Sequence, residues 1–114
     1  MPDDRSTLTT AALYILVAIG PGERHGYSIM TEVEQLTSGA VRLAPGTLYT
    51  TIKRLLGANL IEESGERPDA GLDDQRRRYY RLTPGGRAVV ASEMRRLDSL
   101  VSSARPWALD TDAK

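Results

Sequence analysis

The chain has 114 residues, of which 40% are hydrophobic and 26% are charged, and its 15 Lys and Arg side chains balance 15 Asp and Glu side chains. This length fits one small domain, and this composition is typical of a folded soluble protein rather than a disordered one. The absence of cysteine excludes disulfides, thiolate metal sites and thiol nucleophiles, and a reducing cytoplasm is expected. Because the net charge is zero, any binding to nucleic acid must come from a local patch.

No segment of the sequence predicts a membrane span or a targeting signal. The longest apolar stretch covers residues 11–19, which is short of the roughly 20 residues that cross a bilayer. Asp3 and Asp4, rather than basic residues, precede it. We therefore expect no membrane partner.

The N-terminal part predicts two helices. The first is expected to begin near Ser6 or Thr7, whose hydroxyls can cap free amides, and to end at the Gly-Pro-Gly turn of residues 20–22. The second begins around His25, has apolar residues at helical spacing and ends at residues 38–39. His25 is the single histidine and has no cysteine to share a metal with, so we expect it to serve the start of this helix.

A short strand is expected at residues 41–43, followed by a third helix that begins at Pro45. Leucine and isoleucine residues between 48 and 56 form one apolar stripe on this helix. The opposite face is small, hydroxylated and basic, and it carries Gly46, Thr47, Thr50, Lys53 and Arg54. Such a face is slim enough to enter the major groove of DNA, although by itself it could also be an ordinary solvated surface.

The next segment predicts a β-hairpin with strands at residues 60–63 and 78–82 and a loop centred on residues 68–71. Period-two alternation places Tyr80 and Leu82 on one face of the second strand. The candidate phosphate-binding arginines of this region are Arg76, Arg77 and Arg78, with Arg42 in support. Asp73 and Asp74 precede them, and a charged edge strand that resists aggregation is the alternative explanation.

Thr83 and Pro84 predict the cap and first turn of a fourth helix that extends to about Ser102. Its apolar residues have the four-three-four spacing of a coiled-coil seam, and they are Val90, Met94, Leu97 and Val101. We expect this seam to pack partly on the first helix and partly on a second copy, giving a homodimer whose interface also includes Leu8 and Ala12. In the flexible tail expected over residues 105–114, Trp107 either anchors the tail or stacks on a flat ligand between subunits.

The order of these elements is helix, helix, short strand, helix, hairpin, helix. It predicts a mainly α fold with a small β-hairpin, an α+β winged helix-turn-helix in which the third helix enters the major groove and the hairpin lies against the flanking backbone. Residues 1–82 would form the DNA-binding domain, and residues 83–104 would form the dimerisation helix.

Three stretches carry a resemblance to the PadR family of transcriptional regulators. They are residues 25–27 (His-Gly-Tyr), residues 45–49 and 53–55 (Pro-Gly-Thr-Leu-Tyr and Lys-Arg-Leu), and residues 78–83 and 86–87 (Arg-Tyr-Tyr-Arg-Leu-Thr and Gly-Arg). The resemblance implies that Tyr49 contacts operator DNA, that the arginine-rich wing contacts phosphate and that the last helix forms the dimer. It further implies the smaller subgroup with a single C-terminal dimerisation helix, and a small aromatic molecule as effector.

We therefore expect a cytoplasmic, sequence-specific repressor that binds double-stranded operator DNA with an inverted repeat as a homodimer. The alternative is a winged-helix module that binds another protein and never DNA, which the zero net charge and the acidic residues near the wing leave open. An enzyme is not expected, because the sequence has one histidine, no cysteine, no phosphate-binding glycine loop and no recognisable carboxylate pair. No cofactor or metal is expected.

Overall fold

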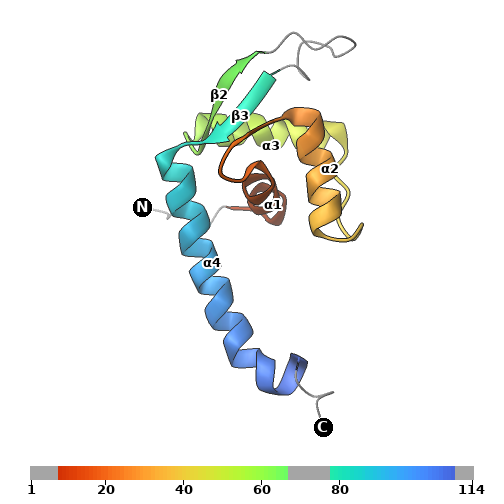
Figure 1. Cartoon of the computed structure of the whole chain (residues 1–114), viewed down its shortest axis with the longest axis vertical. Helices are drawn as coiled ribbons and strands as arrows, with labels where there is room; N and C mark the ends of the chain where they lie inside the picture. The colour runs from red at the N-terminus through yellow and green to blue at the C-terminus, as the bar shows by residue number, and fades with distance from the viewer. Residues whose placement is uncertain (1–7, 67–77, 110–114) are drawn as a thin grey trace.

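The chain folds into a head of three helices and a small sheet, from which a long helix projects (Figure 1). A computed structural model describes residues 8–66 and 78–109. Its elements are α1 (Thr10–Ile19), β1 (Glu23–His25), α2 (Gly26–Leu36), α3 (Pro45–Gly57), β2 (Ile61–Glu66), β3 (Arg78–Leu82), α4 (Pro84–Ala104) and the π-helical turn η2 (Arg105–Leu109). Because α4 runs from the head to the far end of the molecule, the longest dimension is 54 Å and the shortest 23 Å.

The core of the head is built around α1. Ile15, Leu16 and Ile19 of α1 are almost completely buried, as suits a helix that is covered on several sides. The residues that pack around them are Ile29 and Val33 of α2, Leu48, Ile52 and Leu55 of α3, Ile61 of β2 and Tyr80 of β3. The apolar stripe predicted for α3 is therefore confirmed, and that predicted for α2 is confirmed at Ile29 and Val33 but not at Leu36, which is 48% exposed.

The predicted hairpin of β2 and β3 belongs to a three-stranded antiparallel sheet. β3 lies between β1 and β2, and β1 pairs with it so that Glu23 is opposite Arg81. The strand predicted at residues 41–43 is wrong: these residues have no strand structure, and the amide of Val41 donates to the hydroxyl of Thr37 at 3.0 Å. Residues 23–25 form the strand instead because the chain passes the free edge of β3 there, whatever their own propensity.

Side chains cap the first two helices at positions that the sequence predicts in part. Thr9 caps α1, because its hydroxyl accepts a hydrogen bond from the amide of Ala12 at 3.0 Å. Ser6 and Thr7, the predicted caps, lie outside the described residues. His25 caps α2 through Nδ1, which accepts from the Ser28 amide at 3.2 Å, and this confirms its predicted place at the start of the helix.

Hydrogen bonds join the start of α4 to the short segment between α3 and β2. The Thr83 hydroxyl donates to the carbonyl oxygen of Asn59 at 2.7 Å and accepts from the Gly86 amide at 3.0 Å, so it is the predicted cap of α4. The Thr83 amide also donates to the carbonyl of Leu60 at 3.1 Å. Gly86 is buried against that carbonyl, and a β-carbon at this position would overlap it. Glycine is therefore required at the point where α4 leaves the head.

Several predictions fall on residues that the structure does not describe. The loop centred on residues 68–71 lies outside the described residues, as do Asp73, Asp74, Arg76 and Arg77. The predicted tail, residues 105–114, begins with η2, which continues the helical path of α4 as far as Leu109. Among the helices described here, none is both long and apolar enough to cross a membrane.

The contact at Gly86 makes a testable prediction about folding. Gly86→Ala should lower the free energy of unfolding by about 1–3 kcal/mol, the usual range for overpacking, because backbone rather than a movable side chain opposes the new methyl group. Gly85→Ala is the matched control: it lies in the same first turn, and its β-carbon would be 3.6 Å from Thr83 Oγ1 and 3.7 Å from the Asn59 carbonyl oxygen, which are ordinary contacts.

The control should be neutral or slightly stabilising, since alanine favours helix over glycine by up to about 1 kcal/mol. Urea unfolding of the two variants measures the difference. Equal unfolding midpoints would contradict the close approach of α4 to the Leu60 carbonyl.

Candidate nucleic-acid interface

The outer face of α3 is the first component of the candidate interface. Leu48, Ile52 and Leu55 turn inward to the core, and this leaves the opposite side of the helix open to solvent. All five residues predicted on that side are exposed, and they are Gly46, Thr47, Thr50, Lys53 and Arg54. The helix therefore presents short side chains near its start and two cations near its end.

The start of α1 lies beside this face and extends it. A shallow groove of about 440 Å³ separates the two helices and is lined by Thr9, Ala11, Gly46, Thr47, Thr50, Thr51 and Arg54. Four of these seven residues are threonines, whose hydroxyls can donate to phosphate oxygens. Sequence reasoning missed Thr9, because its capping pattern shows a helix start but not which helix lies next to it.

Tyr49 is half-buried at the junction of α2 and α3. A β-carbon on Gly26 would come within 2.8 Å of the Tyr49 hydroxyl and 2.9 Å of its Cε1 atom, so only glycine leaves room for the ring. Two of the motifs noted in the sequence, around residues 26 and 49, are thus opposite sides of one contact. The contact sets the position of Tyr49 and holds the start of α2 against α3.

Burial and neighbouring charges change the pKa of Tyr80, which lies on β3 and belongs to the core. Burial raises the pKa of the Tyr80 phenol above its ordinary value, Glu63 and Tyr49 raise it further, and Arg78 opposes the increase. The phenol therefore stays neutral at physiological pH, which suits a side chain in the core.

Two of the predicted phosphate-binding arginines, Arg42 and Arg78, lie among the described residues; both are exposed and already have carboxylate partners. Arg42 lies 3.4 Å from Glu34, and Arg78 lies 3.7 Å from Glu63. Pairs this exposed contribute only about 0–1 kcal/mol, so either arginine can exchange its carboxylate for a phosphate at little cost. For Lys53 and Arg54, no salt bridge with another described residue is present.

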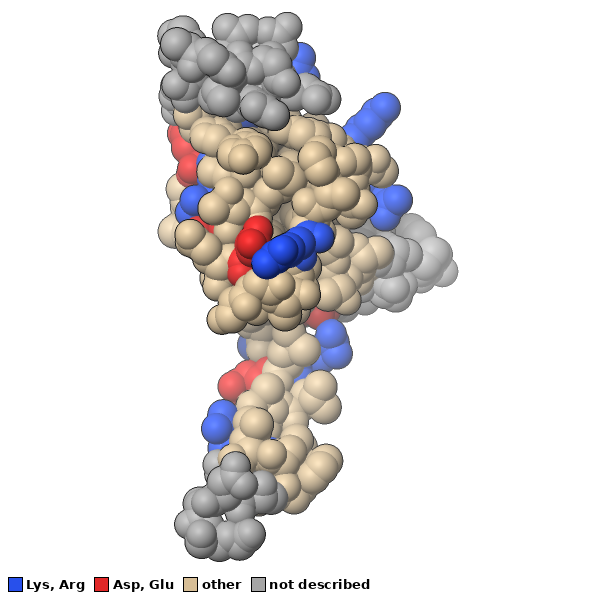
Figure 2. Space-filling model, turned by 90° about the vertical axis from the view of Figure 1, so that its right-hand side faces the viewer, with Lys and Arg blue, Asp and Glu red and all other residues tan. Residues whose placement is uncertain are grey.

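Charge is spread thinly over the face of the head that Figure 2 presents. Figure 2 shows Lys and Arg side chains that stand out one by one, with Asp and Glu side chains between some of them. No broad basic surface is seen on this face. Because the net charge of the chain is also zero, an interface with DNA would depend on local contacts.

The residues predicted at a dimer interface fall into three groups, which are half-buried, exposed and buried in the core. Leu8 and Val90 are half-buried against the core of their own chain, and Leu97 is half-buried on α4. Met94 and Val101 are exposed. Ala12 lies in the core with 5% of its surface exposed, because α1 is covered there by the rest of the head, and we therefore leave it out of the interface that we propose.

Comparison with known proteins identifies the family. The sequence profile of the transcriptional regulator PadR-like family matches residues 15–92, which include the second half of α1, the sheet, α2, α3 and the first part of α4. The chain belongs to this family. The transcriptional regulator Rv3488 of Mycobacterium tuberculosis is 36% identical over 88 residues, which are 77% of this chain and 76% of that protein. The family consists of transcriptional regulators, in agreement with the prediction that the chain is not an enzyme.

Solved structures of regulators share the fold. A transcriptional regulator from Clostridium thermocellum superposes with a TM-score of 0.68 at 19% identity, covering 95% of this chain and 99% of that one. A PadR family transcription regulator from Clostridium difficile has a TM-score of 0.66 at 21% identity, covering 87% and 98%. RosR of H. salinarum has a TM-score of 0.64 at 26% identity, covering 96% and 86%. The predicted winged-helix fold is therefore confirmed.

The contact between Gly26 and Tyr49 can be tested by a double-mutant cycle. Gly26→Ala should lower the free energy of unfolding by about 1 kcal/mol, the low end of the range for overpacking, because the methyl group meets the outer end of the half-buried Tyr49 side chain, which can shift. In a Tyr49→Leu background the same substitution should cost less, because the ring is gone. Gly22→Ala, whose β-carbon would have no neighbour within 4 Å, is the control. An unchanged cost in the Tyr49→Leu background would show that the two residues do not meet.

Proposed function

We propose that this protein is a sequence-specific DNA-binding repressor that acts as a homodimer on an inverted-repeat operator. The observation that carries the proposal is the outer face of α3, which is exposed along its length while its opposite side is anchored in the core. Membership of a family of transcriptional regulators supports it. A cytoplasmic location is part of the proposal.

The chemistry of α3 suits the major groove. Gly46 adds no side chain at the start of the helix, so the backbone there can approach the DNA closely. The hydroxyls of Thr47 and Thr50 can donate or accept at base edges, and Lys53 and Arg54 supply cations for phosphates or for guanine. The Tyr49 hydroxyl is the further contact that the resemblance to the family implies.

Phosphate contacts would surround the recognition helix. Thr9 lies on one side of α3 across the shallow groove, and Arg78 lies at the start of β3 in the sheet that would form the wing. Arg42, in the segment between α2 and α3, adds a cation near the start of α3. Arg76 and Arg77 complete the proposed set on the basis of the basic run in the sequence and of the resemblance to the family. These contacts would fix the register of α3 without reading sequence.

The helix α4 would form the dimer, as in the smaller subgroup that the sequence resembles. Its exposed apolar residues Met94 and Val101, with Leu97 between them, continue the seam that begins at Val90. The chain has a radius of gyration of 16.0 Å, compared with roughly 13 Å for a compact domain of this length, because α4 leaves the head. A second copy would cover this projecting helix and would place two α3 helices about 10 base pairs apart.

Release from DNA by a small aromatic molecule is the further element of the proposal. Such a ligand would have to bind one dimer geometry better than another and so change the separation of the two α3 helices. The resemblance to the family is the basis for this element.

A module that binds protein and never DNA is the second candidate function. The pairing of Arg78 with Glu63 and of Arg81 with Glu62 favours it, because both described arginines of β3 have their charge balanced within the sheet. The two functions differ in what the outer face of α3 contacts, and this can be measured.

Charge removal on α3 tests the proposal. Lys53→Ala combined with Arg54→Ala should weaken binding to the DNA upstream of the protein's own gene by about 10- to 100-fold, as two lost contacts of about 1 kcal/mol or more each would. Arg95→Ala with Arg105→Ala removes the same charge from exposed positions on α4 and η2 and should have a much smaller effect. Fluorescence anisotropy at fixed salt gives both affinities. Unchanged DNA binding in the α3 variant, with loss of a protein partner, would favour the second candidate.

The salt dependence of binding separates phosphate contacts from base contacts. The logarithm of the association constant should fall linearly with the logarithm of salt concentration, with a slope of about 0.9 per phosphate contacted. Arg78→Ala should reduce that slope by about 1 for each subunit, whereas Thr47→Ala should weaken binding and leave the slope unchanged. A flat salt response would contradict DNA binding through phosphates.

A further inference from the structure

Trp107 is the most exposed large apolar side chain of the described residues. It lies on η2 with 71% of its surface exposed, and its neighbours Leu109 and Leu100 are 57% and 60% exposed. It is also the single tryptophan of the chain. Tryptophan combines a large apolar surface of about 150–250 Å² with one N–H donor, so an ordered turn that presents it to solvent is an unusual arrangement for an isolated subunit.

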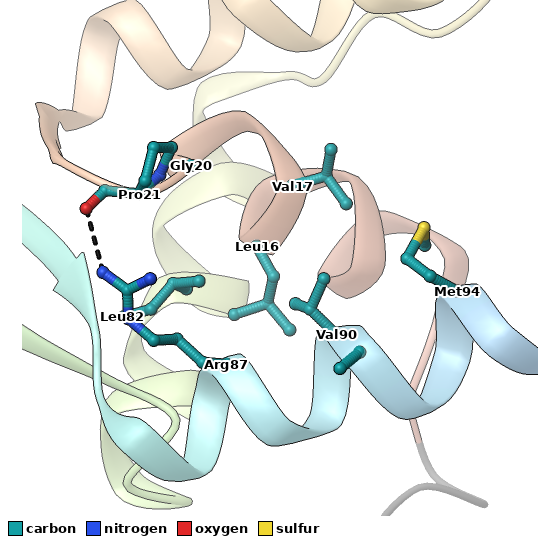
Figure 3. A pocket seen from close by; sticks show the side chains of 9 residues that line it. Leu16, Val17, Gly20, Pro21, Leu82, Arg87, Val90 and Met94 are labelled. Atoms are coloured by element: carbon teal, nitrogen blue, oxygen red, sulfur yellow. Dashed lines mark hydrogen bonds between the residues drawn. The ribbon is translucent and has the colours of Figure 1, made fainter.

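An apolar groove lies at the other end of α4. It has a volume of about 360 Å³ and separates the C-terminal half of α1 from the first turns of α4. Figure 3 shows Leu16 and Val17 of α1 facing Val90 and Met94 of α4 across it. Arg87 closes one end, where its Nη2 atom donates to the carbonyl of Pro21 at 2.9 Å. This hydrogen bond holds the flat guanidinium at the rim of an otherwise apolar space.

Trp107 cannot reach this groove within its own chain. From Val90 to Trp107 the chain follows α4 and η2, which separate the two residues by about 25 Å at 1.5 Å per residue. Figure 1 shows the C-terminal end of α4 far from the head. Trp107 could therefore fill only the groove of another molecule.

The apolar seam on α4 indicates that this other molecule is a second copy of the chain. If two α4 helices pair antiparallel about a two-fold axis, Val90 of one lies opposite Val101 of the other, and Met94 lies opposite Leu97. The same register continued to the last residue of α4 brings Ala104 opposite Arg87 at the end of the groove, and Trp107 follows three residues later on η2. Two-fold symmetry then supplies one tryptophan for each of the two grooves.

We propose that Trp107 of each subunit inserts into the groove between α1 and α4 of the other subunit. The indole would lie at the end of the groove beside Pro21 and Leu82, with its face against the Arg87 guanidinium in a cation–π contact. The inference rests on the proposed dimer and goes beyond it, because it assigns the anchor that positions the dimer.

The anchor has a consequence for DNA binding. The C-terminal half of α1 lines the Trp107 groove through Leu16 and Val17, while Thr9 and Ala11 at its other end line the groove beside α3. α1 is one buried helix, so a tryptophan seated at one end constrains the direction of the recognition face at the other. The Trp107 contact therefore sets the relative orientation of the two α3 helices.

Intrinsic fluorescence of the full chain tests the inference, because Trp107 is the single tryptophan. In a dimer verified by analytical ultracentrifugation, its emission should be blue-shifted and protected from acrylamide, and both properties should be lost on dilution to monomer. Ala91→Phe fills the groove and should shift the emission of the dimer to the red.

Trp107→Ala should raise the dimer dissociation constant by about 30-fold or more, as for a buried tryptophan at an interface. Leu36→Ala, which truncates an exposed leucine on α2, should leave it unchanged.

The outcomes separate this inference from the proposed function. A stable dimer that binds DNA while Trp107 remains solvent-exposed would overturn the inference and leave the repressor intact. A chain that stays monomeric at all concentrations and on DNA would overturn both. A blue-shifted tryptophan in a dimer that does not bind DNA would support the anchor and contradict the proposed function.

Discussion

Burial of α1 is the constraint on which the rest of the structure depends. Ile15, Leu16 and Ile19 are almost completely removed from solvent, and α2, α3, the sheet and the start of α4 all pack around this one helix. Each of those elements therefore has an inner face that is determined by α1 and an outer face that remains available. For α3 the inner face is apolar, and the outer face with Thr47, Thr50 and Lys53 is left exposed as a direct result.

Two close backbone approaches set the orientation of the elements that α1 gathers. Gly26 admits the ring of Tyr49 and so sets how α2 meets α3, and Gly86 admits the carbonyl of Leu60 and so sets how α4 leaves the head. Such contacts tolerate little displacement, because a methyl group added at either glycine would overlap its neighbour. They make the direction of α4 relative to α3 a property of the head, which matters for a protein proposed to present two recognition helices at a set spacing.

Electrostatics contributes locally rather than through net charge. The chain is neutral overall, and several arginines form exposed ion pairs with glutamates, as Arg42 does with Glu34. Exposed pairs are weak, so these cations remain able to contact phosphate, and weak non-specific attraction leaves more of the discrimination to contacts with bases. This balance suits the operator-specific repressor that we propose, and the chain belongs to a family of transcriptional regulators.

What the sequence determined by itself is local. The apolar stripes of α2 and α3, the proline at the start of α3, the Thr83 cap and the alternation of β3 depend on residues a few positions apart, so periodicity and capping rules predict them. The family motifs also lie in these elements. The outward face of α3 could therefore be named residue by residue before its surroundings were known.

Only the tertiary structure decided which distant segments meet. Residues 23–25 form a strand because they lie along the edge of β3, whereas residues 41–43, with better strand propensity, have no partner strand. Thr9 lies beside the outer face of α3, and Ala12 is buried in the core. The groove proposed for Trp107 lies between α1 and α4, which are far apart in the sequence. Strand pairing, burial and grooves depend on contacts across the fold, and local sequence patterns do not encode which segments those contacts will join.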